Sequence, residues 1–179
     1  MNPPTIEAGS EGRVLARPLP PRVAFALGTI LSVTGWIVAA ILAWPWLATV
    51  DRNRALLVLV APHMVLRFVG LSFFVPGTVS NALPVRWSVP AGYGDLGAGL
   101  LAIIATLALH CEARWAVAAV WIFNAWGATD LLFAFYRGAR VRLNPSSLGA
   151  AFYVVTSVVP MLLVSHALVF ALLLRTAHA

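Results

Sequence analysis

Apolar residues in this chain gather in five long runs that are separated by short polar stretches. Each run is near or above the roughly 20 residues that a helix needs to cross about 30 Å of hydrocarbon. The pattern predicts an all-α fold, a polytopic membrane bundle of five transmembrane helices within residues 22–175. The predicted spans are Arg22–Leu47, Ala55–Val75, Ala91–His110, Trp115–Tyr136 and Ser147–Leu174.

The two ends of the chain lack this apolar pattern. Residues 1–21 are rich in proline and polar side chains and hold too few apolar ones to pack, so we expect a disordered cytoplasmic tail. A basic segment before an apolar run is also the pattern of a signal peptide. The run that starts at Arg22 is long enough to span a membrane, which favours an uncleaved first helix. We expect residues 176–179 to form a short C-terminal tail.

Composition supports a membrane protein and argues against a nucleic-acid partner. Residues are 61% hydrophobic and 10% charged, whereas a soluble domain carries about 25% charged residues. The net charge of +6 comes from arginines that lie mostly at the ends of the apolar runs, as interfacial anchors do. No basic cluster with interleaved aromatic residues occurs, so no nucleic acid is expected as a partner. A single cysteine, Cys111, excludes an internal disulfide.

The placement of arginines predicts the orientation. With five spans, one side of the membrane receives the N-terminal tail and the connections at residues 76–90 and 137–145. That side carries seven of the twelve arginines, the opposite side carries four, and the twelfth is Arg67 inside a span. Positively charged residues are enriched on the cytoplasmic side. The N-terminus is therefore predicted to be cytoplasmic.

Arg67 is the most informative residue, because a charged group in the middle of a membrane span costs roughly 3 kcal/mol on insertion scales. His63 lies one helical turn before it. The candidate counter-ions are Asp95 and Asp130, on two other spans. At about 1.5 Å per residue, Arg67 lies about 12 Å and Asp130 about 9 Å from the predicted cytoplasmic ends of their spans, and Asp95 lies within about one turn. The sequence predicts an intramembrane polar site.

Charge balance suggests different roles for the two aspartates. One arginine with one or two carboxylates leaves a net charge near zero or minus one, so one aspartate is the candidate counter-ion and the other a candidate proton-exchanging group. Asp95 has an alternative interpretation as a helix N-cap in the turn at residues 90–94. Arg67, Asp95 and Asp130 together also have an alternative, purely structural interpretation, because a buried arginine–aspartate pair can simply fix the register of the helices.

Other polar and aromatic residues extend this site. The amide of Asn124, near the middle of the fourth span, needs a partner on a neighbouring helix or on a ligand. It lies about 120° around the helix from Asp130, so the two cannot line one narrow groove. The candidate ligand-binding residues are Arg67, His63, Asn124, Asp130, Asp95 and Trp126, and the candidate catalytic residues are Asp130, Asp95 and His63.

A second polar group is predicted in the outer half of the bundle. His110 ends the third run, Cys111 and Glu112 follow it, and His166 lies about 28 Å from the predicted cytoplasmic start of the fifth span. Two histidines at similar depth could ligate a haem iron, or a metal together with Cys111 or Glu112. Because this spacing is not diagnostic, no cofactor or metal is predicted, and haem stays an alternative.

Two segments carry a resemblance to known sequences, Val89–Asp95 and Phe123–Leu131. They resemble a group of small, uncharacterised bacterial multi-pass membrane proteins with a PAG-x-GD turn and an N-x-x-G-x-x-D helix. The likeness extends over about residues 60 to 140. It implies a multi-helix protein of the bacterial cytoplasmic (inner) membrane and no established activity.

Three classes of function fit these observations. The first is a protein that binds or transports a small anionic or amphiphilic ligand at Arg67, which with five spans is expected to form a homo-oligomer. The second is a membrane-embedded enzyme acting on a lipid or isoprenoid, with an aspartate as general acid or base. The third is a haem or metal protein, or an accessory subunit of a larger membrane complex. The sequence favours the first and does not decide whether the protein is an enzyme.

Overall fold

A computed structural model describes residues 19–175. The predicted tails at residues 1–21 and 176–179 lie outside this range, except for residues 19–21. In the part of the chain that is described, every regular element is helical, and five helices are long and apolar enough to cross a membrane. The predicted all-helical bundle of five such helices is therefore confirmed.

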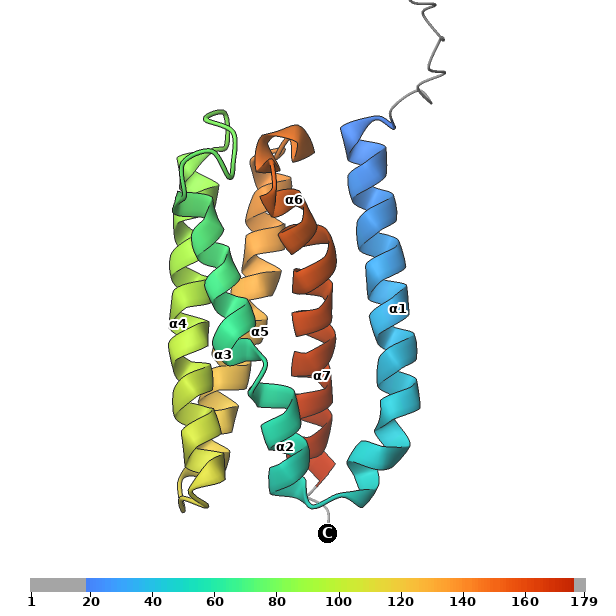
Figure 1. Cartoon of the computed structure of the whole chain (residues 1–179), viewed down its shortest axis with the longest axis vertical. Coiled ribbons are helices and arrows are strands. Elements are labelled where there is room, and N and C mark those ends of the chain that lie inside the picture. The colour runs from blue at the N-terminus through green and yellow to red at the C-terminus, as the bar shows by residue number, and fades with distance from the viewer. Residues whose placement is uncertain (1–18, 176–179) are drawn as a thin grey trace, which may run out of the picture.

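The helices run up and down along one bundle axis (Figure 1). The first span is α1 (Pro21–Thr49), the third is α4 (Val85–His110) and the fourth is α5 (Ala116–Arg140). The second and fifth spans are built from several pieces. The second span comprises α2 (Arg52–Val60), α3 (His63–Leu66) and η1 (Arg67–Phe74). The fifth span comprises α6 (Ala151–Tyr153), η3 (Val154–Val158) and α7 (Val159–Arg175), and the short 3₁₀ helix η2 (Pro145–Leu148) precedes it.

The second span is broken near its middle. Pro62 has no N–H to give to the carbonyl four residues before it, and α2 ends at Val60. The chain resumes as the single turn α3 and then tightens into the 3₁₀ helix η1, which begins at Arg67. Irregular backbone at membrane depth is tolerated where it is buried in protein or lines a cavity. The break therefore lies beside two buried polar side chains of this span, His63 and Arg67.

The helix α4 begins six residues earlier than the sequence predicted, at Val85 rather than Ala91. Pro90, which suggested a boundary, lies inside the helix. It cannot donate to the carbonyl of Arg86, and that carbonyl instead accepts a hydrogen bond from the guanidinium of Arg137 on α5. The alternative interpretation of Asp95 as a helix N-cap is wrong, because Asp95 lies in the helix interior rather than at its start.

The core lies between α4, α5, α7 and the second span. The helix α4 packs along α5 and η1, and α7 packs against α1, α2 and α5. The helix α1 stands at the edge of the bundle, beside α7 (Figure 1), and Leu47 is its one residue counted as buried. The four other spans thus form the framework that positions polar side chains.

The end of the bundle that holds the start of α1 is tied together by two loops. The backbone N–H of Ser80 donates to the carbonyl of Ser147, and that of Ala150 donates to the carbonyl of Thr78. Gly149 lies between Ser147 and Ala150 with φ +53°, a conformation that residues with a Cβ disfavour. A Cβ on Gly149 would also overlap the carbonyl oxygen of Thr78. Gly149 is therefore required for this loop pairing.

Replacing Gly149 tests this contact. We expect Gly149→Ala to lower the free energy of unfolding by about 1–3 kcal/mol, because the backbone must move away from both the positive φ and the Thr78 carbonyl. Thermal unfolding in detergent micelles, followed by tryptophan fluorescence, measures the change. The matched control is Gly35→Ala on α1, where nothing lies within 4 Å of the added Cβ. A Gly149→Ala protein as stable as this control would contradict the interpretation.

Candidate functional site

Arg67 is the centre of the polar site and is fully buried, with 0% of its surface exposed. Its Nη1 donates to Asp95 Oδ1 on α4 at 2.7 Å and to Asp130 Oδ2 on α5 at 3.1 Å. Among residues 19–175, both ion pairs are made by this one guanidinium. The two aspartates predicted as counter-ions therefore share Arg67. With both ionised, one positive and two negative charges leave the set at minus one.

The other terminal nitrogen of Arg67 points to two further helices. Its Nη2 donates to the backbone carbonyl of Gly127 on α5 at 2.6 Å and lies 2.8 Å from Nε2 of His166 on α7. A guanidinium carries two hydrogens on each terminal nitrogen and accepts none. All four terminal N–H groups of Arg67 are thus engaged within the protein. One residue connects η1, α4, α5 and α7.

Hydrogen-bond chemistry fixes the tautomer of His166. Because Arg67 can only donate, His166 Nε2 must accept, so the ring hydrogen lies on Nδ1. That Nδ1 is 2.6 Å from Asn124 Oδ1, which accepts from it, and Asn124 Nδ2 donates to the His166 carbonyl at 3.1 Å. Asn124 is 0% and His166 is 1% exposed. Asn124 therefore reaches the site through His166, consistent with its predicted separation from Asp130.

Two glycines let the helices approach this closely. A Cβ on Gly127 would lie 2.6 Å from Cε1 of His166 and 2.8 Å from Nη2 of Arg67. A Cβ on Gly94 would overlap the carboxylate of Asp130. Gly94 and Gly127 belong to the two segments that carried the resemblance. In both segments, the glycine makes room for a polar contact and the aspartate supplies one.

His63 lies beside this network rather than in contact with the guanidinium. The hydroxyl of Ser165 donates to the carbonyl of Leu59 at the break in the second span, so His63 Nε2, 3.1 Å from that hydroxyl oxygen, is the donor to it. The His63 ring packs 4.6 Å from the His166 ring and 5.0 Å from that of Phe123, between ring centroids. His63 therefore belongs to the buried wall of the site.

The site lies farther from the ends of its helices than the sequence predicted. Asp95 is ten residues from the start of α4 and Asp130 ten residues from the end of α5, which places each about 15 Å along its helix. Arg67 is seven residues from the end of η1, or about 14 Å at the rise of a 3₁₀ helix. The distances for the two aspartates exceed the predicted ones because α4 and α5 extend beyond their apolar runs. The distance for Arg67 is larger because η1 has the greater rise of a 3₁₀ helix. The three charges meet at a common level.

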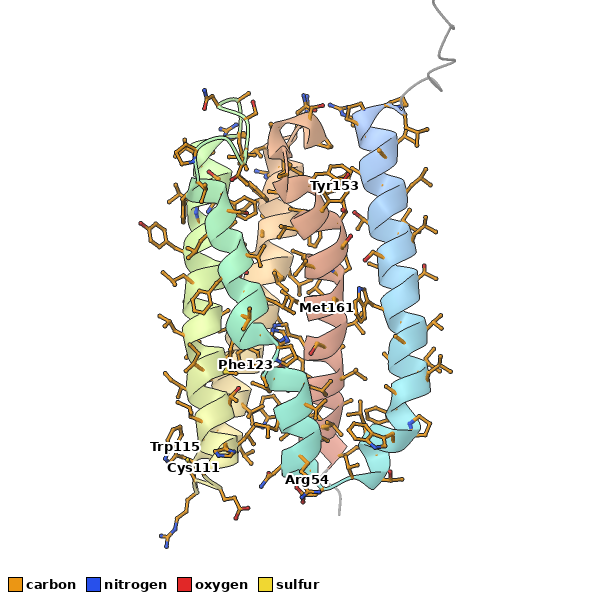
Figure 2. The ribbon with its side chains drawn as sticks, viewed as in Figure 1. Arg54, Cys111, Trp115, Phe123, Tyr153 and Met161 are labelled. Atoms are coloured by element: carbon orange, nitrogen blue, oxygen red, sulfur yellow. The ribbon has the colours of Figure 1, made fainter. Side chains whose placement is uncertain are left out.

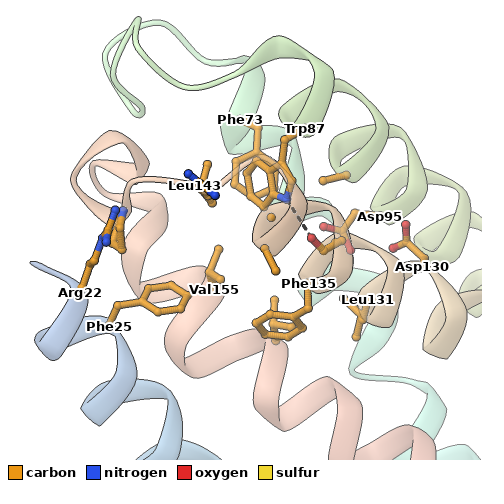
Figure 3. A pocket seen from close by; sticks show the side chains of 17 residues that line it. Arg22, Phe25, Phe73, Trp87, Asp95, Asp130, Leu131, Phe135, Leu143 and Val155 are labelled. Atoms are coloured by element: carbon orange, nitrogen blue, oxygen red, sulfur yellow. Dashed lines mark hydrogen bonds between the residues drawn. The ribbon is translucent and has the colours of Figure 1, made fainter.

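A cavity of about 340 Å³ leads to the two aspartates. Its walls come from apolar and aromatic side chains of α4, α5, η1 and the fifth span, including Phe73, Trp87 and Phe135. Figure 3 shows Asp95 and Asp130 at one end of this cavity and Arg22 at the other. Arg67 does not line the cavity, so the carboxylates lie between the guanidinium and the open space.

The remaining predicted site residues lie elsewhere. Trp126 is 53% exposed and faces outward, with its Nε1 3.5 Å from the carbonyl of Gly94. His110 is exposed and ends α4, about 22 Å along the helix from Asp95. His166 contacts Arg67, so the predicted pairing of these two histidines at one depth is wrong. Within residues 19–175, no group of three or more His, Cys, Asp or Glu side chains could hold a metal ion.

Sequence reasoning missed the part that His166 plays. The predicted start of the fifth span at Ser147 placed it in the outer half, whereas the continuous helix starts at Ala151, so His166 lies closer to the start of its helix. Helical side chains also lean toward the N-terminal end, which brings the imidazole toward Arg67. The available signal was the buried arginine itself, because the five N–H donors of its planar fork point in directions that aspartates on two helices do not all cover.

Removing the guanidinium tests whether it holds the four elements together. Arg67→Met leaves two buried carboxylates without a counter-ion, and we expect the free energy of unfolding to fall by about 3–5 kcal/mol. The triple variant Arg67→Met, Asp95→Asn, Asp130→Asn should recover at least half of that loss, since no uncompensated charge remains. Unfolding in mixed micelles measures both. Equal stability of the single and triple variants would contradict an electrostatic role. The control is Arg140→Gln at the exposed end of α5, which should leave the free energy of unfolding unchanged.

Comparison with known proteins yields a family and no activity. No curated protein and no solved structure matches the chain. The family described as "Domain of unknown function (DUF8737)" matches residues 21–174, which include all five long helices and every residue of the polar site. This agrees with the expectation of an uncharacterised family. The chain therefore belongs to the DUF8737 family.

Proposed function

We propose that this chain is an integral membrane protein that binds or transports a small amphiphilic molecule, held in the cavity with its hydrogen-bond-donating end at Asp95 and Asp130. The observation that carries this proposal is the cavity of about 340 Å³ that ends at two carboxylates sharing one arginine. Ligand pockets of this size typically have apolar walls and a few polar groups that fix orientation.

The charges at the inner end define the group that binds there. The four terminal N–H groups of Arg67 are engaged by Asp95, Asp130, Gly127 and His166. An anion at Arg67 would have to displace one of them and would meet two carboxylates. A proton or an ammonium instead offsets the remaining negative charge, and a hydroxyl donates a hydrogen bond to the carboxylates. Arg67 therefore orients the carboxylates, and the carboxylates receive the ligand.

The walls define the rest of the ligand. Between the aspartates and Arg22 the cavity is lined by apolar side chains, among them Leu131, Phe135 and Val155. An apolar body gains free energy by leaving water for such walls, at roughly 25 cal/mol per Å². Together with the polar inner end, this favours an amphiphile over an ion or a sugar.

The broken second span supports a binding or transport role. In many transporters, the substrate site lies near the bilayer midplane and is formed by discontinuous helices. Here the break at residues 61–62 lies one turn before Arg67, which lies about 14 Å from the end of its span. This discontinuous span agrees with the cavity that ends at the partners of Arg67.

The arginines support an orientation for the cavity. The end of the bundle at which α1 begins carries Arg22, Arg86, Arg137, Arg140 and Arg142, and the opposite end carries Arg52, Arg54, Arg114 and Arg175. With Arg13 and Arg17 of the N-terminal segment, the count is seven against four. We therefore propose a cytoplasmic N-terminus in a bacterial inner membrane, with the cavity reached from the cytoplasmic side.

Labelling of cysteine tests this orientation. Cys111 is exposed in the turn between α4 and α5, at the end of the bundle that also holds Trp115 and Arg54 (Figure 2). A membrane-impermeant maleimide added to intact spheroplasts should modify Cys111 fully. The matched control, Cys111→Ser with Ser146→Cys in η2 at the other end, should react only after lysis. The reverse pattern would invert the proposed topology.

Binding of a simple amphiphile tests the proposed function. In lipid nanodiscs, with the signal of empty nanodiscs subtracted, we expect dodecan-1-ol to bind about tenfold or more tightly than its methyl ether, because the ether has no hydrogen to donate to the carboxylates. Asp130→Asn should weaken alcohol binding by a similar factor.

Cavity-filling variants control this measurement. Ala134→Phe places a large side chain in the cavity and should abolish binding of the alcohol. Leu132→Phe, on the outward face of the same helix, should leave it unchanged. Equal binding by the alcohol and the ether, or by both phenylalanine variants, would contradict the proposal.

A further inference from the structure

Two arginines line the cavity at the end opposite the aspartates. Arg22 is the second residue of α1, and Arg142 follows the end of α5. Both are exposed and both line the cavity, so they mark its mouth. Among residues 19–175, neither guanidinium has a carboxylate within ion-pair distance, because both ion pairs there belong to Arg67.

We propose that Arg22 and Arg142 bind an anionic group on the ligand, so that the molecule taken by this site is a bipolar amphiphile: an anion at one end, an apolar body, and a hydrogen-bond donor at the other end. This inference rests on the proposed function and names its ligand class. An anionic group held by guanidinium groups accepts several charge-assisted hydrogen bonds from them.

The mouth arginines differ from the other arginines at this end of the bundle. Arg137 is used within the protein, because it donates to the carbonyl of Arg86 and lies over the ring of Phe133. Arg140 is exposed and does not line the cavity. Interfacial anchoring alone explains arginines at a membrane boundary. It does not require that two of them, from segments 120 residues apart in the sequence, line the same cavity.

Local structure brings Arg142 to this cavity. After α5 the backbone takes φ +51° at Arg142, and its N–H donates to the carbonyl of Ala139. The N–H of Leu143 then donates to the carbonyl of Gly138. A positive φ is disfavoured for a non-glycine residue and persists where its surroundings determine it. On the other side, Phe25 packs its ring edge to face on Phe152, which holds the start of α1 against the fifth span.

The separation of the two polar ends sets the length of the ligand. Asp130 and the end of α5 at Arg140 are ten residues apart, or about 15 Å along the helix. At bond lengths of about 1.5 Å, an extended chain of roughly twelve carbons covers this distance. The charges also oppose a reversed orientation, since an anion at the inner end would face Asp95 and Asp130.

The experiment compares two probes that differ in one end group, 12-hydroxydodecanoate and 1,12-dodecanediol, by equilibrium binding to the full chain in nanodiscs. We expect the wild-type protein to bind the hydroxy acid at least tenfold more tightly than the diol. The double variant Arg22→Gln, Arg142→Gln should bind both with the affinity that the wild type shows for the diol. Arg22→Lys, Arg142→Lys should retain most of the preference, and Arg140→Gln all of it.

Each outcome distinguishes this inference from the function on which it rests. Binding of the diol by the double glutamine variant shows that its cavity is intact. If the wild type binds both probes equally, or if Arg140→Gln loses the preference as the double variant does, the anion-binding role is wrong and the proposed function stands. If the wild type binds neither probe, both fail.

Discussion

A guanidinium inside a membrane protein must have its N–H groups satisfied by the protein, because the surrounding hydrocarbon offers no acceptor. Arg67 meets this requirement at its four terminal N–H groups, with acceptors from three different helices: two carboxylates, a backbone carbonyl and an imidazole nitrogen. Its Nε is buried without a hydrogen-bond partner. These four hydrogen bonds require that η1, α4, α5 and α7 pack closely enough for the guanidinium to reach an acceptor on each of the other three helices. The glycines at positions 94 and 127, the His166 tautomer and the Asn124 contact follow from that one need.

The same requirement connects structure to chemistry. Two carboxylates around one arginine leave an unneutralised charge at the inner end of an apolar space. A network built only to fix helix register has no need of a second acid or of a cavity beside it. The arrangement keeps two acceptor groups oriented at the inner end of the cavity, about 15 Å along α4 and α5 from the ends of these helices, where we propose that they hold a hydrogen-bond donor on a ligand.

The fold was largely predictable, because long apolar runs specify membrane helices almost independently of tertiary contacts. Arg67, Asp95 and Asp130 were also identifiable, because a charge within such a run is costly. The start of α4 could not be predicted, because Pro90 is a residue typical of a helix start. The helix continues through Pro90, and the carbonyl of Arg86, which Pro90 cannot serve, accepts a hydrogen bond from the Arg137 side chain on α5. The place of His166 could not be predicted either, because it depends on where Gly149 lets the fifth helix begin. Both errors arose where a contact distant in sequence decided local structure.

The peripheral position of α1 has a consequence for how the cavity exchanges its contents. The helix contributes Arg22 and Phe25 to the cavity wall, yet Leu47, at its far end, is its one residue in the buried core. Because α1 contributes so little to the buried core, its outward movement disrupts fewer contacts than that of the other spans. Tilting of α1 away from α7 would turn the closed side of the cavity into a lateral opening. Molecules in the bilayer leaflet beside α1 would then reach the site as well as those that enter through the mouth at Arg22 and Arg142.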